Sequence, residues 1–114
     1  MDAQLRRGLL DICVLAVLRR GDSYGYQLVK DVSELIEITE STLYPILRRL
    51  ESGGLVTVYS VEHNSRLRKY YQITDAGRQR ILDFLEEWKA VMHAYQIIER
   101  EAEGEGNDEG TFSV

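Results

Sequence analysis

The sequence predicts a mainly α-helical fold with a small β-hairpin, and three observations support this prediction. Apolar residues recur three or four positions apart in three stretches before residue 53, which is the spacing of helices that bury one face. Two short runs of alternating β-branched and aromatic residues follow, as expected for a pair of strands. After these runs the helical spacing returns and is kept for two heptads, which predicts a long last helix.

The composition is that of one small domain. The chain has 114 residues, of which 44% are hydrophobic, and this is enough apolar material for a single core. One cysteine, Cys13, excludes an intrachain disulfide, and its apolar neighbours predict a buried thiol in a reducing compartment. No apolar run has transmembrane length, and the N-terminus lacks a signal-peptide pattern. We therefore expect a cytoplasmic protein that does not bind membranes.

The charge is unevenly distributed along the chain. Its formal net value of -5 argues against a nucleic-acid-binding protein only if it is taken as a single number. Residues 1–80 hold 12 of the 14 Lys and Arg side chains against 10 acidic ones, whereas residues 81–114 hold 2 basic side chains against 9 acidic ones. This division permits a weakly basic binding face with an acidic tail directed elsewhere.

The first expected helix covers residues 4–20 and is apolar on nearly all sides between residues 9 and 18. Such a helix must be covered from several directions, so we expect part of it to meet a second copy of the chain. Asp11 interrupts the apolar run, either as a carboxylate at the rim or as one that faces a ligand. Ser23 is then expected to cap a second helix, in which Gly25 permits the close approach of a neighbour.

The third expected helix lies in the stretch ITESTLYPILRRLESGGLV, residues 38–56. Thr39 can cap it, and its apolar residues share one face, which leaves polar, aromatic and cationic side chains on the other. Pro45 removes one backbone hydrogen bond, so we expect a bend near the N-terminal end. Gly53 and Gly54 end the helix, where a positive φ is needed. The helix is a candidate reader of DNA, and an ordinary amphipathic helix with a solvated face is the alternative.

The two expected strands, residues 56–61 and 69–73, are joined by a polar segment. Three cations lie at this connection, namely Arg66, Arg68 and Lys69. A solvated hairpin tip is the simpler explanation for them. Directly after a helix that carries two arginines, however, the hairpin predicts the wing of a winged helix-turn-helix.

The last expected helix is capped by Thr74 and Asp75 and runs to about residue 100. A seam of apolar side chains along it suits dimerisation, and it consists of Ile81, Leu85, Trp88, Met92 and Tyr95. Two heptads are too few for an isolated coiled coil, so this helix should contact both its own domain and a partner. We predict a winged-helix DNA-binding domain over residues 1–74, a dimerisation helix over 75–100 and a disordered acidic tail over 101–114.

In its motifs and their order the chain resembles the PadR family of transcriptional regulators. The resemblance covers residues 5 to about 98 and is carried by three groups of residues. These are Tyr24-Gly25-Tyr26, the run TLYPILRRLE at 42–51 with Gly54-Leu55 after it, and the run RKYY at 68–71 followed by ITDAGR at 73–78. The match is to the shorter branch of the family, in which a single C-terminal helix forms the dimer. The resemblance implies a homodimeric repressor that releases DNA when a small molecule binds.

The resemblance also implies an effector site. In some short members of the family, a tryptophan of the C-terminal helix lies at the dimer interface, where paired indoles sandwich flat aromatic compounds. Trp88 occupies the corresponding place here, which implies a planar hydrophobic effector between two copies of Trp88. Leu85 and Met92 would line the pocket, with Asp11 as a polar contact at its edge. The alternative is that Trp88 packs as part of the dimer core.

Two elements are expected to contact DNA. The contacts expected from the third helix are Ser41, Thr42, Tyr44, Arg48 and Arg49. This helix would enter the major groove, where Arg48 can pair bidentately with a guanine. On the wing, Arg66, Arg68 and Lys69 suit phosphates or an adjacent minor groove. The expected partner is double-stranded DNA with an inverted repeat, because a two-fold dimer presents two recognition helices.

Two other functional classes are weaker alternatives. A dimeric winged-helix module that binds proteins and reads no DNA would be supported by a strongly acidic recognition surface, whereas this one is cationic. An enzyme is not expected, because His63, His93 and Cys13 are scattered over different elements and form no nucleophile or ligand constellation. We therefore expect no catalytic residue, no metal site and no cofactor.

Overall fold

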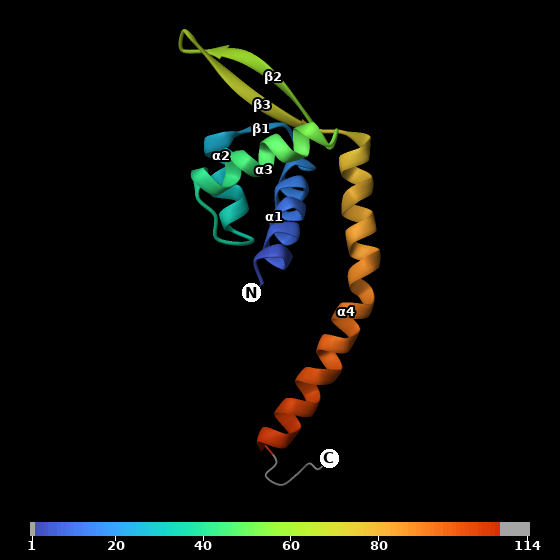
Figure 1. Cartoon of the computed structure of the whole chain (residues 1–114). Helices are drawn as coiled ribbons and strands as arrows, with labels where there is room; N and C mark the ends of the chain where they lie inside the picture. The colour runs from blue at the N-terminus through green and yellow to red at the C-terminus, as the bar shows by residue number, and fades with distance from the viewer. Residues whose placement is uncertain (1, 108–114) are drawn as a thin grey trace. The chain divides into compact units, whose positions relative to one another are not determined.

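A computed structural model describes residues 2–107 of the chain, which contain a three-stranded sheet and four helices (Figure 1). The elements are, in chain order, α1 (Ala3–Leu18), β1 (Ser23–Tyr24), α2 (Gly25–Ser33), α3 (Glu40–Ser52), β2 (Val56–His63), β3 (Arg66–Ile73) and α4 (Asp75–Asn107). They form two compact units, Met1–Leu82 and Asp83–Val114. The predicted winged helix-turn-helix followed by a long C-terminal helix is therefore confirmed.

The core of the first unit is built from the apolar faces of α1, α2 and α3. Its most deeply buried side chains are Val14, Leu15, Leu18, Leu28, Val32, Leu43, Leu47, Leu50 and Val56. Each such side chain contributes about 1.5–3 kcal/mol when it leaves water. The core fixes which side of α3 faces inward, so the opposite side of α3 is presented to solvent.

α1 begins where the sequence places it, and most of its apolar surface is covered by its own unit. The Asp2 carboxylate caps the helix by accepting hydrogen bonds from the backbone N–H groups of Gln4 and Leu5, both at 3.1 Å. Six α1 side chains are buried. Cys13 is only half-buried, and this burial raises the pKa of its thiol above the ordinary value.

The sheet has one strand more than the sequence predicts. Ser23 does not cap α2, because Ser23 and Tyr24 form the short strand β1, which pairs with Tyr71 and Tyr70 of β3. The strand order is β1-β3-β2, so β3 is the central strand. Tyr24 occupies the N-cap position of α2 without a side-chain hydrogen bond to the helix. A two-residue strand is too short to be recognised from alternation in the sequence.

The β2–β3 hairpin is the wing, and in Figure 1 it extends beyond α1, α2 and α3. Its register pairs His63 with Arg66, which leaves a two-residue turn at Asn64 and Ser65. Both turn residues have positive φ, 52° and 66°, as a hairpin turn that follows the twist of the strands requires.

α3 begins and ends where the sequence predicts, with Thr39 at its N-cap position, but the side chain of Thr39 is used differently. Gly54 has a φ of 76°, and the N–H of Leu55 donates to the carbonyl oxygen of Leu50 at 2.9 Å, which closes the last turn. At the other end, the side chain of Thr39 makes no capping hydrogen bond to the helix backbone. Its hydroxyl instead lies 3.1 Å from the hydroxyl of Ser41.

α4 is capped as predicted but is longer. The Thr74 hydroxyl accepts from the backbone N–H of Gly77 at 3.1 Å and donates to the carbonyl oxygen of Gly54 at 2.7 Å. The helix continues to Asn107, past the predicted end near residue 100, so residues 101–107 are not part of a disordered tail. Extending a helix that is already formed needs no new nucleus, and glutamates favour it. The rest of the predicted tail, residues 108–114, lies outside the described residues.

Candidate nucleic-acid interface

The solvent-facing side of α3 is the centre of the candidate interface. At about 100° per residue, Ser41, Pro45 and Arg48 fall within a sector of about 60°, and all three are exposed. This sector is opposite the buried face of α3, so it is the part of the helix that is free to enter a groove. Ser52 at the end of α3 shares this sector, which therefore holds one cation and two hydroxyls.

Tyr44 lies at one edge of this sector and reaches α2. A Cβ atom built on Gly25 would overlap the Tyr44 hydroxyl, so the glycine makes room for the ring. The sequence predicts a close approach at Gly25, and the structure identifies the neighbour as Tyr44. The contact places a phenol hydroxyl at the first turn of α2.

A pocket of about 370 Å³ lies beside Tyr44, where α2, α3 and β3 meet. Its polar lining consists of the tyrosines Tyr24, Tyr26, Tyr44 and Tyr71 with the cations Arg68 and Lys69. The Arg68 guanidinium lies over the ring of Tyr24, 3.9 Å from its centroid. Phenol hydroxyls and two cations around one depression are hydrogen-bond donors for an anion of the size of a phosphate group.

Packed aromatic rings support Arg68 from behind. The Tyr70 ring contacts Tyr24 edge-on with centroids 5.5 Å apart, and stacks on Tyr59 with centroids 5.7 Å apart. The Tyr59 hydroxyl donates to the Asp22 carboxylate at 2.5 Å, and this hydrogen bond raises the pKa of Tyr59 above its ordinary value. Gln72 donates to the same carboxylate at 3.3 Å. The wing is thereby joined to the segment before β1.

Tyr71 couples the wing to α3. Its side chain is buried, and burial is the largest cause that raises the pKa of Tyr71; the neighbouring Tyr44 and Glu51 act in the same direction. Arg48 acts in the opposite direction, because a nearby cation favours the phenolate. The charges of α3 and the base of the wing therefore lie within electrostatic range of each other.

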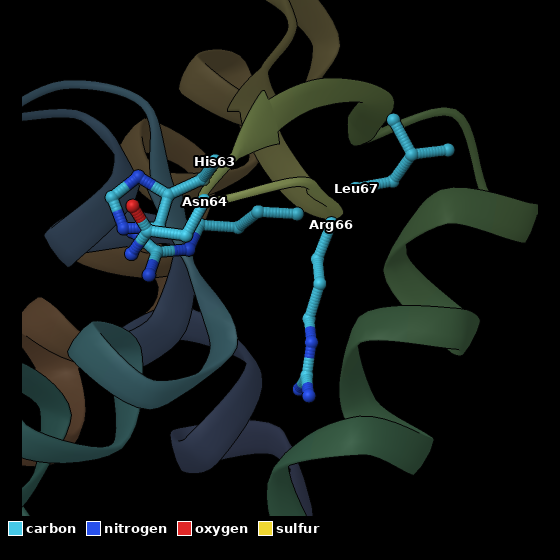
Figure 2. Close-up of a pocket in the computed structure, with 5 residues that line it drawn as sticks. His63, Asn64, Arg66 and Leu67 are labelled. Atoms are coloured by element: carbon cyan, nitrogen blue, oxygen red, sulfur yellow. The ribbon is translucent and has the colours of Figure 1, made fainter.

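The tip of the wing forms a second depression, of about 540 Å³, lined by His63, Asn64, Arg66, Leu67 and Arg68. Figure 2 shows the Arg66 and Leu67 side chains extending from the hairpin in different directions. Leu67 is 75% exposed although it is apolar. A narrow two-residue turn with an arginine beside it has the dimensions and charge to approach a minor groove.

Arg49 departs from the expected arrangement. Its guanidinium is turned toward α1 and forms an ion pair with Asp11 at 2.5 Å, and the side chains of Arg49 and Asp11 are 38% and 15% exposed. Arg49 is therefore not next to Arg48 on the outer sector of α3. Asp11, for which the sequence leaves open a place at the rim or one that faces a ligand, is the partner in this pair.

Of the other predicted residues, Ser41 and Thr42 are exposed on the first turn of α3, and Arg66, Arg68 and Lys69 all lie on β3. Sequence reasoning missed Tyr26 and Asp22 as members of the site. Tyr26 lies within the Tyr-Gly-Tyr motif, and that motif was the available signal. No local sequence pattern indicates the role of Asp22, because its hydrogen-bond partners are 37 and 50 residues away along the chain.

The second unit contains the rest of the predicted apolar seam. The Phe84 and Trp88 rings stack with centroids 5.2 Å apart. Leu85, Met92 and Tyr95 are about half exposed on the isolated chain. Ile81, by contrast, is only 9% exposed and belongs to the core of the first unit, so the exposed part of the seam starts at Leu85. Within residues 2–107, no helix has the length and apolarity needed to cross a bilayer.

Comparison with known proteins gives a consistent result. Residues 14–83 match the model of the transcriptional regulator PadR-like family. A protein of Lysinibacillus sphaericus is 32% identical over 90 residues, which are 75% of this chain and 83% of that protein. A transcriptional regulator from Clostridium thermocellum has a similar structure, with a TM-score of 0.73 and 34% identity over 84% of this chain and 95% of the regulator.

The negative transcriptional regulator PadR of Bacillus subtilis is a more distant relative. It is 28% identical over 82 residues, which are 68% of this chain and 45% of PadR. The crystal structure of B. subtilis PadR in complex with operator DNA matches with a TM-score of 0.63 and 27% identity, over 68% of this chain and 46% of that one.

Proposed function

The chain belongs to the PadR-like family of transcriptional regulators, and on this premise we propose that it represses transcription by binding an inverted-repeat operator as a homodimer. Family membership makes it a DNA-binding regulator and not an enzyme. Repression is supported by the name of its B. subtilis relative, a negative transcriptional regulator. A repressor must reach the chromosome, so the proposed location is the cytoplasm.

The observation that carries the proposal is the position of the phenol-lined cationic pocket next to the outer sector of α3. A major groove about 12 Å wide admits one helix, and its walls are phosphate backbones. The outer sector of α3 is exposed and could enter the groove, while the cationic pocket at its edge would face one phosphate backbone. Tyr44, Arg68 and Lys69 then hold a phosphate while Arg48 faces the base edges.

The proposed contacts have two roles: some position the protein on the duplex, and others recognise the base sequence. Phosphate contacts set the register of the protein on the duplex but carry no sequence information directly, whereas base-edge contacts discriminate between sequences. Arg48 is the side chain in the outer sector able to pair bidentately with a guanine. Arg66 at the tip of the wing is proposed to enter the adjacent minor groove.

The proposed dimer forms through α4. Leu85, Met92 and Tyr95 are apolar, exposed and spaced for one helical face, which supports a partner that covers them. A two-fold dimer places its recognition helices to meet half-sites about 34 Å apart. This is the reason for an inverted repeat in the proposed operator.

A planar hydrophobic effector is proposed to bind next to Trp88 in this dimer, with Leu85 and Met92 lining the site. Two indole faces on a two-fold axis bury more apolar area against a flat molecule than against solvent. Asp11 is left out of this pocket, because its carboxylate is paired with Arg49. The effector releases DNA only if it favours a different spacing of the two recognition helices, since equal binding to both states shifts nothing.

The effector proposal is tested by titrating the DNA-free protein with a bis-benzimidazole dye while following Trp88 fluorescence. Saturable quenching is expected in the wild type. Trp88→Ala has no tryptophan left to follow, so its binding is measured by the fluorescence anisotropy of the dye, and this binding should be lost with the dimer intact. Absence of quenching across a panel of planar aromatic compounds would leave Trp88 as dimer core.

DNA binding is tested with Arg48→Ala, Arg68→Ala and Lys69→Ala. Fluorescence anisotropy should be measured with an operator fragment and with a scrambled fragment of equal length. Arg48→Ala is expected to lose discrimination between the fragments, whereas the two wing variants weaken both alike and reduce the salt slope by about 1 each. Equal losses of affinity for both fragments in all three variants would contradict the division of roles.

A further inference from the structure

We infer that α1 supplies a second phosphate site, which binds a DNA backbone phosphate on the side of α3 opposite Tyr44. The inference rests on the proposed function and adds residues that it does not use. The site is a pocket of about 300 Å³ between the N-terminal part of α1 and the N-terminal half of α3. Arg6 and Arg7 of α1 and Arg49 of α3 contribute its cations.

The pocket carries more positive charge than the neighbouring carboxylates neutralise. Three guanidinium groups line it, and that of Arg49 is paired with the Asp11 carboxylate. The Arg6 guanidinium donates to the backbone carbonyl oxygen of Glu37 at 3.3 Å, which leaves its charge uncompensated. An anion is therefore the ligand that this lining favours.

Within residues 2–107, the side chain of Arg7 is a set of donors at the pocket that no protein group uses. The side chain of Arg7 makes no hydrogen bond or ion pair with any of these residues. Asp11 occupies one edge of the Arg49 guanidinium and fixes its position at the pocket. The free side chain of Arg7 is therefore the group of this lining that is available to an anion.

The position of the pocket identifies the anion. At about 100° per residue, Tyr44 lies on one side of the sector that holds Ser41 and Arg48, while Thr42 and Arg49 lie on the other. The two anion pockets thus lie on either side of the outer face of α3. A helix in a major groove runs between two phosphate backbones, so one pocket is available to each strand.

The apolar part of the pocket fits the same ligand. Leu10 and Ile46 are almost fully buried and form a fixed surface, and the ring of Pro45 lies at its edge. A phosphodiester presents anionic oxygens together with the C–H groups of its deoxyribose. The arginines donate hydrogen bonds to the anionic oxygens, and the apolar surface packs against the deoxyribose. Contacts of this kind fix the register of a protein on DNA.

The test is a double-mutant cycle between Arg7→Gln and single methylphosphonate substitutions, each of which removes the charge of one phosphate of the operator. Arg7→Gln is expected to weaken operator and random DNA by the same factor and to reduce the salt slope by about 1. Neutralising one particular phosphate should weaken binding of the wild type but not of Arg7→Gln. This phosphate should lie on the DNA strand opposite to the strand whose phosphate couples in the same way with Lys69→Gln.

Arg20→Gln is the matched control, because it removes the same charge from the other end of α1, about 20 Å away. It should show no coupling with the phosphate assigned to Arg7. An unchanged affinity and salt slope in Arg7→Gln would overturn the inference, as would coupling of Arg7 with no phosphate or with the one that couples with Lys69. If the wild-type protein binds no operator in any of these measurements, the proposed function itself fails.

Discussion

The absence of a side chain at Gly25 determines where Tyr44 lies. The Tyr44 hydroxyl occupies the space that a Cβ atom would need, so the tyrosine is directed to the pocket by a residue of a different helix. The atom that would be displaced is at the end of a rotatable side chain. A substitution at Gly25 therefore acts on Tyr44 more than on the fold.

Gly25→Ala is expected to weaken DNA binding without a large loss of stability. The added methyl group moves the Tyr44 ring out of the pocket, so affinity for operator and random DNA falls together. The free energy of unfolding should change by no more than about 1 kcal/mol, since only a surface ring is displaced. Anisotropy titrations and urea denaturation measure the two effects.

Gly8→Ala is the control for this substitution. Gly8 lies within α1, and a Cβ atom added there would meet nothing within 4 Å. Alanine should therefore stabilise the helix by up to about 1 kcal/mol and leave DNA binding unchanged. Wild-type affinity in Gly25→Ala would show that Tyr44 does not contact DNA.

A second prediction at the scale of residues concerns Asp11 and Arg49. Asp11→Ala leaves a partly buried guanidinium without its partner and should destabilise the fold by about 1–3 kcal/mol. In a double-mutant cycle with Arg49→Ala, urea denaturation should give a coupling energy above about 0.5 kcal/mol. Additive losses would mean that the pair does not hold α1 and α3 together.

Asp22 connects the wing to the segment before β1 through its hydrogen bond with Tyr59. This bond raises the pKa of Tyr59, so the folded state holds the phenol proton more tightly than the unfolded state does. The contribution to stability is complete below the ordinary pKa of 10.0 and is lost as the pH rises through the higher folded value.

The free energy of unfolding of the wild type should therefore fall more steeply above about pH 10 than that of Tyr59→Phe, which cannot ionise at this position. Urea denaturation of both proteins between neutral and alkaline pH gives the difference. If the free energies of unfolding of the two proteins fell in parallel over that range, the hydrogen bond from the Tyr59 hydroxyl to Asp22 would not stabilise the protonated phenol. The remaining tyrosines are common to both proteins and cancel in the comparison.

The elements differ in how far the sequence determines them. Periodicity identified the four helices and the hairpin, because their buried faces repeat over several turns or strand pairs. The prediction was wrong at Ser23. A serine at this position is typical of a helix cap, but Ser23 pairs with Tyr71 in the sheet instead. The prediction also ended α4 too early, because the apolar periodicity stops near residue 100 and the acidic composition after it is typical of disorder, whereas glutamate favours helix.

The candidate site was predicted by residue type and less well by partner. Charge and amphipathic spacing select Arg48, Tyr44 and the wing cations as candidate contacts, and their contact with DNA stays a prediction. The pairing of Arg49 with Asp11 was not, because 38 residues separate the two and neither motif indicates the other. Contacts that the tertiary fold creates leave no local pattern in the sequence.

At the scale of the whole molecule, the proposed dimer depends on the exposed face of α4. Leu85 is 54% exposed on the isolated chain, and in the proposed dimer a second copy covers it. Leu85→Lys places a charge in the interface without a partner, which should cost several kcal/mol and give monomers at micromolar concentration. Sedimentation velocity measures this. Glu87→Lys, at an exposed polar position of the same helix, should remain dimeric.

A compact wild-type monomer at micromolar concentration would contradict the dimer and, with it, the inverted repeat. The DNA-binding unit would still carry its two pockets, because both lie within Met1–Leu82. Dimerisation and DNA contact are thus separable by measurement.

The central claim is that α3 reads a specific DNA sequence, and the most direct measurement is to sequence the fragments that the purified protein retains from genomic DNA. The fragments should share an inverted repeat with half-sites about one helical turn apart, and the shared motif should weaken or disappear with Arg48→Ala. Retention of random fragments by the wild-type protein, or the same motif with and without Arg48, would contradict the claim.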